Sequence, residues 1–532
     1  MNLLLLSVII LIFLAILTTL AYHAYKQTVT DEDYLIAGRN INPGVMALSY
    51  GATFISTSAI VGFGGAAGLF GFSLLWLAFL TIVLGIMVAF ALFGVRIRKM
   101  SVNLNVSSFP SLLGRRYDSN FLTVFSGFMI FIFMPAYTSI ILVGGARFFE
   151  EALEIDYNLA LFILAIIVGA YVLSGGIKAV MYTDAFCALV MLVGMIALLI
   201  TAYSVVGGVI SSHQALTDLS YMIPENLIEK GHRGWTAMPE PGSQIWLQVI
   251  TNIILGVGIG ALAQPQLAMR FMTVPSTKSL YRAIAVGGFF IFFMTGTAFI
   301  VGPLSNLYFY ETTGMISVEA AGGNTDSIIP LFISEVMPSW FLYLFMVTLI
   351  SAAISTLSSL VHVQGTALSK DIIGPLSSND NDKKQDNTLL ARIGVLIAVL
   401  LAILLAYVLP GSIIARATSF WFGICAASFL PTLIGTLFWP GSSRVGAISS
   451  VVTGLTVSIF GYVFLHISES EVLGLSRLIF GKDALLPFPW THIDPLVYSI
   501  IISGIVFVVV SLFTKPVYNE HLEICYKGVK KL

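Results

Sequence analysis

The sequence predicts an all-α polytopic membrane protein, and three observations favour this fold class. Apolar residues make up 57% of the chain and charged residues only 10%, whereas soluble domains carry about 25% charged residues. About thirteen segments reach the roughly 20 apolar residues that a helix needs to cross a bilayer. Two of these segments, the second and the seventh, are rich in helix-weakening glycine, and the seventh also contains proline.

Length and hydropathy place the predicted transmembrane segments. They lie near residues 2–24, 41–69, 72–95, 121–146, 157–175, 180–208, 243–270, 281–306, 340–371, 389–409, 413–438, 443–466 and 495–514. The joins at 69–72 and 409–413 are very short, so the segment ends are least defined there. The first segment has neither a preceding basic residue nor a clear cleavage site, so we interpret it as a retained helix rather than a signal peptide.

The distribution of lysine and arginine predicts how the segments are oriented. With the N-terminus outside, 20 of the 26 basic residues fall on the inner side, including Arg270 at the end of the seventh segment, and 6 fall outside. We therefore expect a plasma-membrane protein with an external N-terminus and a cytoplasmic C-terminus. The long loops 209–242 and 467–494 then lie outside, and the polar run 373–388 is expected to be a solvated inner linker.

Composition disfavours several function classes. A net charge of −1 gives no basic field that would attract nucleic acid. The three cysteines lack metal-ligand spacing, and the seven histidines are scattered without a nucleophile–base arrangement, so no enzyme is expected. A channel would favour rings of pore-lining residues, and a membrane sensor would need a soluble output domain. Neither feature is visible, and both classes are less favoured alternatives.

The second and seventh segments have the amino-acid composition expected of interrupted helices. The second contains the run Ser49-Tyr-Gly-Ala-Thr-Phe-Ile-Ser-Thr-Ser58 followed by Gly62, Gly64 and Gly65, and the seventh contains Gly256, Gly258, Gly260 and then Gln264-Pro265-Gln266. Backbone carbonyls freed in hydrocarbon must find another partner, and a bound cation is one such partner. The alternative is close helix packing through small residues, which is common in membranes.

The spacing of the two interruptions predicts an inverted repeat. The two interrupted segments are five segments apart. Because five is an odd number of membrane crossings, the second set of five helices would have the opposite orientation to the first, and many secondary transporters have this architecture. The predicted organisation is a peripheral first helix with an inner loop (1–40), a first five-helix repeat (41–208), an extracellular loop (209–242), a second, inverted repeat (243–438), two peripheral helices (439–514) and a cytoplasmic tail (515–532).

Five motifs in this order resemble the sodium/solute symporter family over roughly residues 30–440. They are Tyr34-Leu-Ile-Ala-Gly-Arg39, the run at 49–58, Ser174-Gly-Gly-Ile-Lys-Ala-Val-Met-Tyr-Thr-Asp184, Gln264-Pro-Gln-Leu-Ala-Met-Arg270 and Ala352-Ala-Ile-Ser-Thr-Leu-Ser-Ser359. The family includes carriers of proline, pantothenate, sugars, sialic acid and monocarboxylates. The resemblance implies a leucine-transporter-like fold of five plus five inverted helices and sodium-coupled symport of a small organic solute. A proton-coupled symporter of the same fold is the alternative.

The resemblance also implies a site for the co-transported sodium ion between the second and ninth segments. Its ligands would be the backbone oxygens of Ala52, Ile55 and Ala352 and the hydroxyls of Ser355 and Thr356. Hard cations prefer such oxygen donors, and positions 352, 355 and 356 share one helical face. Without the resemblance, hydroxyl residues in a transmembrane helix more often indicate hydrogen bonding between helices.

A second sodium site is implied by some members of the family. It would comprise Asp184 and three hydroxyls of the ninth segment, those of Ser355, Ser358 and Ser359. Carboxylates inside a membrane are costly and usually functional. The alternative is that Asp184 lies near a cytosolic helix start, where an acidic residue is favoured by the helix dipole.

The solute is expected beside the two interruptions, with the eleventh segment opposite. The candidate residues are Thr53, Phe54, Ser56, Thr57, Val257, Ala261, Gln264, Gln266, Ser419 and Trp421. They include no acid or base, and binding pockets are generally lined by such neutral groups. Similar proline carriers would be expected to have Asp where Phe54 stands, and similar sugar carriers polar residues at Val257 and Gly260.

These departures favour a small carboxylate, such as a monocarboxylate or a pantothenate-like acid, over proline. A helix N-terminus can hold a carboxylate without any arginine. The alternative for the two glutamines is that Gln264 and Gln266 only cap the broken helix.

Overall fold

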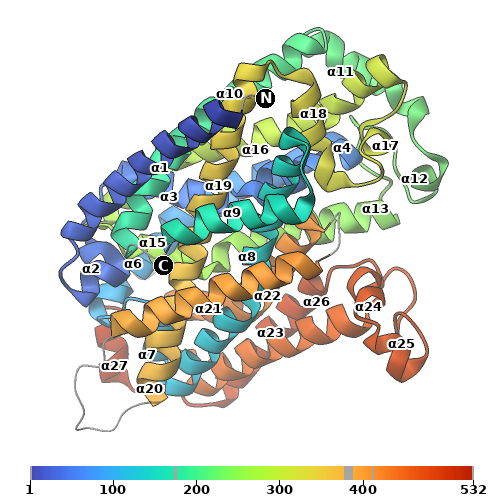
Figure 1. Ribbon diagram of the computed structural model, residues 1–532. Helices are drawn as coiled ribbons and strands as arrows, with labels where there is room; N and C mark the ends of the chain where they lie inside the picture. The colour runs from blue at the N-terminus through green and yellow to red at the C-terminus, as the bar shows by residue number, and fades with distance from the viewer. Residues whose placement is uncertain (1–2, 173–175, 377–386, 410–412, 530–532) are drawn as a thin grey trace.

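The computed structural model describes residues 3–172, 176–376, 387–409 and 413–529, and its secondary structure in these ranges is helical (Figure 1). Eleven of the described helices are long and apolar enough to cross a membrane. The count of thirteen therefore stays a prediction, and it also includes the interrupted second segment and the short apolar helix Tyr157–Ile167. The join at 409–413 and most of the predicted linker 373–388 lie outside the described residues.

The helices follow the predicted segments closely. Those that form the transmembrane body are α1 Leu3–Lys26, α3 Pro43–Phe54, α4 Phe63–Phe70, α5 Leu75–Ile82, α6 Val95–Asn103, α8 Asn120–Leu153, α9 Tyr157–Val172, α10 Ile177–Val205, α15 Pro265–Phe271, α16 Thr277–Thr313, α19 Ser339–Thr366, α21 Asn387–Val408, α22 Ile414–Phe438, α23 Arg444–Phe464 and α26 Pro495–Phe513. Wider π-helical turns continue several of them, namely η2 Ser58–Gly62, η4 Val83–Gly94, η6 Gln248–Val257 and η9 Ala367–Ile373.

Both predicted interruptions are present. Helix α3 ends at Phe54, and Ile55 leaves the helical conformation with φ −89° and ψ 102° before the chain turns into η2. In the seventh segment Gln264 is extended, and Pro265 begins α15. Proline suits the first position of a helix because its missing N–H would be unpaired there, and it forces the preceding residue out of the helical region.

The glycines that follow the first interruption serve close packing rather than the break itself. A Cβ on Gly302 of α16 would lie 2.2 Å from the Gly64 carbonyl oxygen, and a Cβ on Gly65 would lie 1.9 Å from that of Thr325. Helix α4 therefore touches α16 on one side and the 325–327 turn on the other, with no room for side chains. The packing interpretation of these glycines is the correct one, because small residues let membrane helices approach closely.

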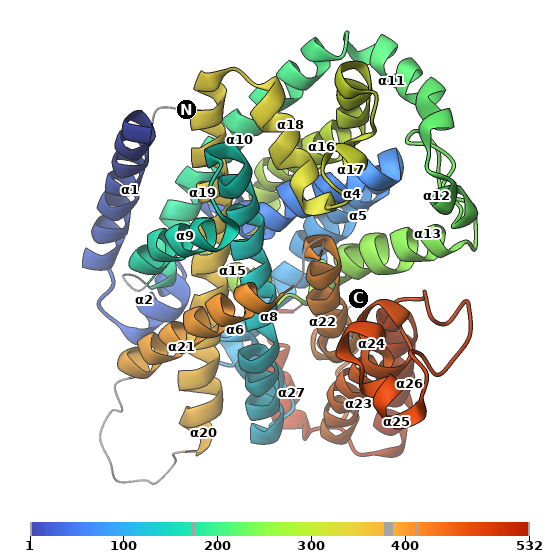
Figure 2. The same ribbon diagram turned by 45° about the vertical axis from the view of Figure 1, so that its right-hand side comes forward.

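Short helices close the two ends of the bundle. Helices α11 (Val209–Asp218), α17 (Ser317–Ala320) and α18 (Ile328–Val336) gather at one end, and α20 (Gly374–Leu376) and α27 (Asn519–Cys525) lie at the other (Figures 1 and 2). The buried Trp235 attaches the 209–242 loop to α4 by donating its indole N–H to the Gly68 carbonyl at 2.9 Å. This predicted loop is therefore a folded cover rather than a free connection.

The 209–242 loop also contains a buried histidine, His232, whose protonation should lower the stability of the protein in acid. His232 donates from Nε2 to the Leu69 carbonyl at 2.8 Å and accepts the Gly234 N–H at Nδ1, which requires the neutral ring. Burial lowers the pKa of His232 below its usual value of 6.5. The unfolded state then binds the proton more readily, so stability is full above about pH 6.5 and falls as the pH drops below it.

We therefore expect His232→Gln to flatten the melting-temperature profile between about pH 6.5 and 5. Wild type should lose stability over this window, and the variant should lose less because it cannot take up a proton there. Melting temperature in detergent, measured across the window, checks this. His213→Gln is the matched control in the same loop and should keep the wild-type slope. Equal slopes for wild type and His232→Gln would contradict the assignment.

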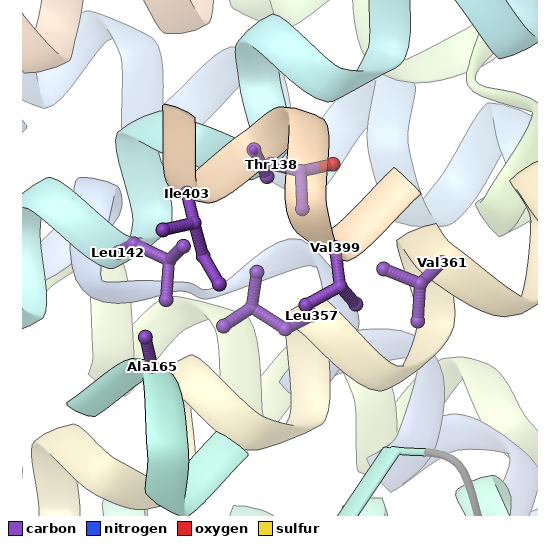
Figure 3. A pocket seen from close by; sticks show the side chains of 8 residues that line it. Thr138, Leu142, Ala165, Leu357, Val361, Val399 and Ile403 are labelled. Atoms are coloured by element: carbon purple, nitrogen blue, oxygen red, sulfur yellow. The ribbon is translucent and has the colours of Figure 1, made fainter. Parts of the chain in front are cut away.

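The ninth segment has two unlike faces. One face of α19 packs with α8, α9 and α21 around a small apolar crevice lined by Leu357, Val361, Val399 and Ile403 among others (Figure 3). The opposite face presents a run of buried hydroxyls toward α3 and α10. Because the apolar face is fixed by packing, the hydroxyl face is held against the interruption of the second segment.

Candidate ion and solute site

The hydroxyls of α19 meet the open end of α3. Ser355 Oγ donates to the Ala52 carbonyl at 3.0 Å and lies 3.3 Å from the Ala352 carbonyl. Thr356 Oγ1 lies 3.2 Å from the carbonyls of both Ala52 and Thr53. All these residues are buried. The arrangement gathers two hydroxyl and three carbonyl oxygens, which is the donor set that a hard cation such as sodium prefers.

Four of the five predicted ligands are thus brought together, and a further oxygen joins them. The described hydrogen bonds of the Ser355 and Thr356 hydroxyls include one to the Thr53 carbonyl and none to that of Ile55, the buried residue that directly follows α3. A helix leaves its last four carbonyls without intrahelical partners. The Ala52 and Thr53 carbonyls at the end of α3 are therefore available to the hydroxyls of α19. The position of Thr53 in the last turn of this helix could have placed it among the predicted ligands.

Asp184 lies two turns inside α10 and not at its start, because α10 begins at Ile177. The helix-dipole interpretation of this residue is therefore wrong. Its carboxylate is fully buried and accepts hydrogen bonds from Ser49 Oγ and from Arg270, each at 2.8 Å. The predicted partners Ser358 and Ser359 are more distant, at 3.5 and 3.4 Å.

Arg270 was expected among the inner-side charges, and the structure places it inside α15 as a fully buried residue. Its guanidinium donates to Asp184 Oδ2, to the hydroxyls of Ser49, Thr53 and Ser359, and to the Gln266 carbonyl. These partners belong to α3, α10, α15 and α19. The pair therefore ties both interrupted segments to α19, the helix of the predicted sodium ligands Ser355 and Thr356.

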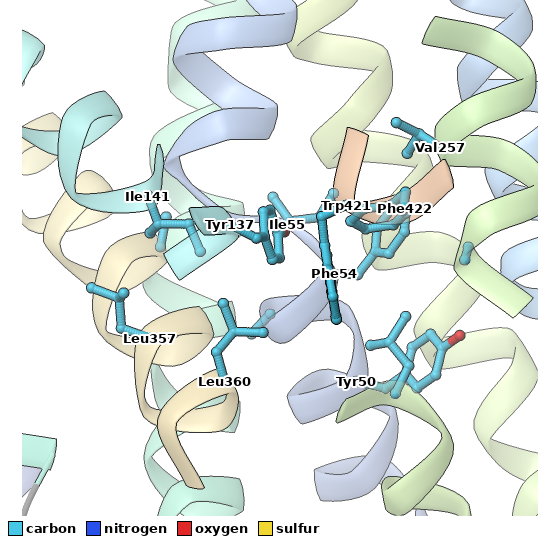
Figure 4. Close-up of a cluster of buried hydrophobic side chains, with 14 of the residues drawn as sticks. Tyr50, Phe54, Ile55, Tyr137, Ile141, Val257, Leu357, Leu360, Trp421 and Phe422 are labelled. Atoms are coloured by element: carbon cyan, nitrogen blue, oxygen red, sulfur yellow. The ribbon is translucent and has the colours of Figure 1, made fainter. Parts of the chain in front are cut away.

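A small cavity lies on the other side of the interruption. It is lined by rings and by uncharged hydroxyls, namely Phe54, Phe63, Phe299 and Phe422, and Ser58, Thr81, Tyr137, Thr295 and Thr418. Figure 4 shows Phe54 near Phe422 and Tyr137, close to Ile55. The ring centroids of Phe54 and Phe422 are 6.2 Å apart, and those of Tyr137 and Phe422 are 5.6 Å apart. This cavity suits a small solute with an apolar body.

The predicted solute residues occupy several places. Phe54 and Val257 line the cavity, and Ser56 shares a hydrogen bond of 2.6 Å with Ser58 at its edge. The remaining candidates are buried and are not among the lining residues. Thr53 bonds Arg270, Thr57 bonds the Ile141 carbonyl and Ser419 bonds the Ala415 carbonyl, whereas Ala261 and Trp421 pack in the core.

The two predicted glutamines stabilise the second interruption. Gln264 Nε2 donates to the Gly260 carbonyl at 3.3 Å, and Gln266 Nε2 donates to Gln264 Oε1 at 3.0 Å. Both side chains are buried. Gln264 thus satisfies a backbone carbonyl at the break, as in the capping alternative, whereas Gln266 bonds the side chain of Gln264.

Sequence reasoning did not include Tyr137, Thr295 or Thr418. Each lies in an apolar segment close in sequence to another hydroxyl residue, outside the five motifs, and they reach the cavity from α8, α16 and α22. Polar residues in transmembrane helices tend to mark functional positions, which is the signal that could have found them.

Comparisons with known proteins agree with this geometry. Residues 34–454 match the family described as the sodium:solute symporter family. The chain is 28% identical over 485 residues to sodium/proline symporter 2 of Staphylococcus saprophyticus, which covers 89% of each chain. It is 29% identical over 523 residues to a sodium/proline symporter of Staphylococcus aureus, covering 96% of this chain and 92% of that one.

A solved structure shares the fold. It is a Na+-coupled sialic acid symporter captured in a substrate-bound, outward-open state. The TM-score is 0.75 at 18% identity, and the match covers 96% of this chain and 98% of the other. The predicted all-α, leucine-transporter-like architecture is confirmed.

Proposed function

Because the chain belongs to the sodium:solute symporter family, we propose that it imports a small, carboxylate-bearing solute together with sodium. It is a membrane transporter and not an enzyme. The observation that supports sodium as the coupled ion is the meeting of the Ser355 and Thr356 hydroxyls with the carbonyls of Ala52 and Thr53. Each of these oxygens is neutral, so the site can bind a cation without carrying a permanent charge of its own.

The solute class follows from the cavity and the helix start beside it. The cavity contains aromatic rings and hydroxyls but no charged side chain among its lining residues. The chain resumes helical structure at Thr57 and Ser58, and the first N–H groups of a helix attract carboxylates. A solute with a carboxylate and a compact apolar body fits both features.

Proline is the first such solute to test, because the similar staphylococcal proteins are sodium/proline symporters. The ring of Phe54 offers no acidic partner to the amine of proline. Monocarboxylates and pantothenate-like acids are therefore the second group of solutes to test.

The proposed location is the plasma membrane, with the N-terminus outside and the C-terminus in the cytoplasm. Without the buried Arg270, 19 of the 20 basic residues first assigned to the inner side remain there against 6 outside, and lysine and arginine favour the cytoplasmic side. In this orientation α11, α17 and α18 cover the outer end, and α27 packs at the inner end.

We expect uptake into proteoliposomes to fall by roughly 5- to 150-fold when choline replaces sodium, the usual range for coupling between two ligands. Proline, lactate and pantothenate are tested separately at constant pH. Uptake that persists in choline would contradict sodium coupling. Acceleration by an inward proton gradient in the absence of sodium would support the proton-coupled alternative instead.

A further inference from the structure

The ion pair between Asp184 and Arg270 has a consequence for the number of ions that the protein binds. We propose that the Arg270 guanidinium occupies the position at Asp184 that a second sodium ion would take, so that the carboxylate binds no sodium while the pair is intact. This inference rests on the proposed sodium-coupled function. It assigns Arg270 the role of a tethered cation that limits the ion stoichiometry.

The carboxylate is already neutralised. Asp184 Oδ2 receives Arg270 at 2.8 Å, and both side chains have no exposed surface. Charges so close interact strongly away from water, and a like charge brought beside them is repelled equally strongly. A sodium ion at Asp184 would lie next to the guanidinium, in a site whose two charged side chains have no exposed surface. The single negative charge of Asp184 is therefore neutralised by one cation, the Arg270 guanidinium.

The oxygens that a second ion needs are also in use. Arg270 donates to Ser359 Oγ at 2.5 Å and to Thr53 Oγ1. Both hydroxyl oxygens therefore direct lone-pair density at the guanidinium. Ser358 approaches the carboxylate only at 3.5 Å, at the limit of a hydrogen bond. The predicted second donor set is thus present, and an arginine is bound to it.

The first site differs in this respect although it is one helical turn away. The hydroxyls of Ser355 and Thr356 donate to the carbonyls of Ala52, Ala352 and Thr53, and no cationic side chain is among their described partners. A hydroxyl can rotate its proton away and turn its oxygen to an arriving ion. Only the first site can therefore accept sodium without displacing a protein cation.

The test counts sodium ions bound per chain by equilibrium dialysis of the purified full-length protein with radioactive sodium. Three proteins are compared: wild type, Arg270→Gln, and the double variant Arg270→Gln with Asp184→Asn. Wild type and the double variant should bind equal numbers of ions. Arg270→Gln alone should bind one more, because its carboxylate is freed for sodium, and its Hill coefficient should rise accordingly.

Two results would overturn the inference. One is a double variant that binds one ion fewer than wild type, since Asp184 would then hold sodium beside Arg270. The other is a folded Arg270→Gln protein that gains no ion. If that variant does not fold, the comparison of wild type with the double variant, which buries no unpaired charge, still decides.

The number of sodium ions that the wild-type protein binds separates this inference from the proposed function. A wild-type protein that binds no sodium would refute sodium coupling, whereas the gain of one ion in Arg270→Gln would still support the role of Arg270. Arg98→Gln is the matched control. Arg98 donates to the Val274 carbonyl at 2.5 Å at the inner face, so its loss removes a positive charge without freeing a buried carboxylate. Its ion count should equal that of wild type.

Discussion

Thr356→Val is expected to raise the sodium concentration for half-maximal uptake by roughly 5- to 150-fold. The substitution removes one neutral oxygen that faces the carbonyls of Ala52 and Thr53, and losing such a buried polar partner costs about 1–3 kcal/mol. A factor of ten in affinity corresponds to about 1.4 kcal/mol. Ser355→Ala should act in the same direction. Sodium titration of solute uptake in proteoliposomes measures the change.

Two controls separate ion binding from folding and from solute binding. Thr348→Val removes a buried hydroxyl of the same helix whose described hydrogen bond goes to the Leu344 carbonyl, so its sodium dependence should stay normal. Thr356→Ser restores the oxygen and should recover most of the affinity. Solute affinity in Thr356→Val should return at very high sodium, because coupling between two ligands is reciprocal. Normal sodium dependence with weakened solute binding would instead assign these hydroxyls to the solute pocket.

The fold was largely predictable because the bilayer restricts it. A backbone in hydrocarbon must satisfy its own hydrogen bonds, so apolar length alone placed most helices. Pro265 favoured the second interruption by local chemistry, since proline lacks a backbone N–H, suits the first position of a helix and disfavours a helical conformation at the residue before it. The glycines after the first interruption could not be interpreted locally. Gly64 is explained only by the Ile329 side chain of α18 lying against it, and Gly65 only by the backbone of the 325–327 turn.

The candidate site was also predictable only where the information is local to one segment of the sequence. Ala352, Ser355 and Thr356 share a helical face by spacing alone, and the motif order supplied their partner Ala52. Arg270 was missed because its position at the end of a segment is typical of a cytoplasmic charge. Its burial depends on the packing of α15 against α3 and α10, which joins residues far apart in the chain. The three cavity hydroxyls that the sequence did not predict come from three separate helices, so they were missed for the same reason.

The buried ion pair predicts a strong non-additivity in stability. Asp184→Ala should lower the free energy of unfolding in detergent by about 3–5 kcal/mol, because it leaves the Arg270 guanidinium buried without a counter-charge. Arg270→Ala should cost a similar amount by exposing the carboxylate to an apolar interior. The double variant Asp184→Asn with Arg270→Gln should be far closer to wild type, since both charges are removed together and neither is left buried without a counter-charge. Denaturant titration of the purified proteins, followed by circular dichroism, measures all three.

The pair Arg147–Glu150 is the matched comparison. It joins residues three positions apart on α8 at 2.8 Å, and its side chains keep 18% and 28% of their surface exposed. Solvent screens such a pair, so removing either partner should change stability by only about 0–1 kcal/mol. If Asp184→Ala were no more harmful than Glu150→Ala, the buried carboxylate would be protonated and uncharged. If the two single losses at 184 and 270 simply added in the double variant, the residues would act independently rather than as a coupled pair.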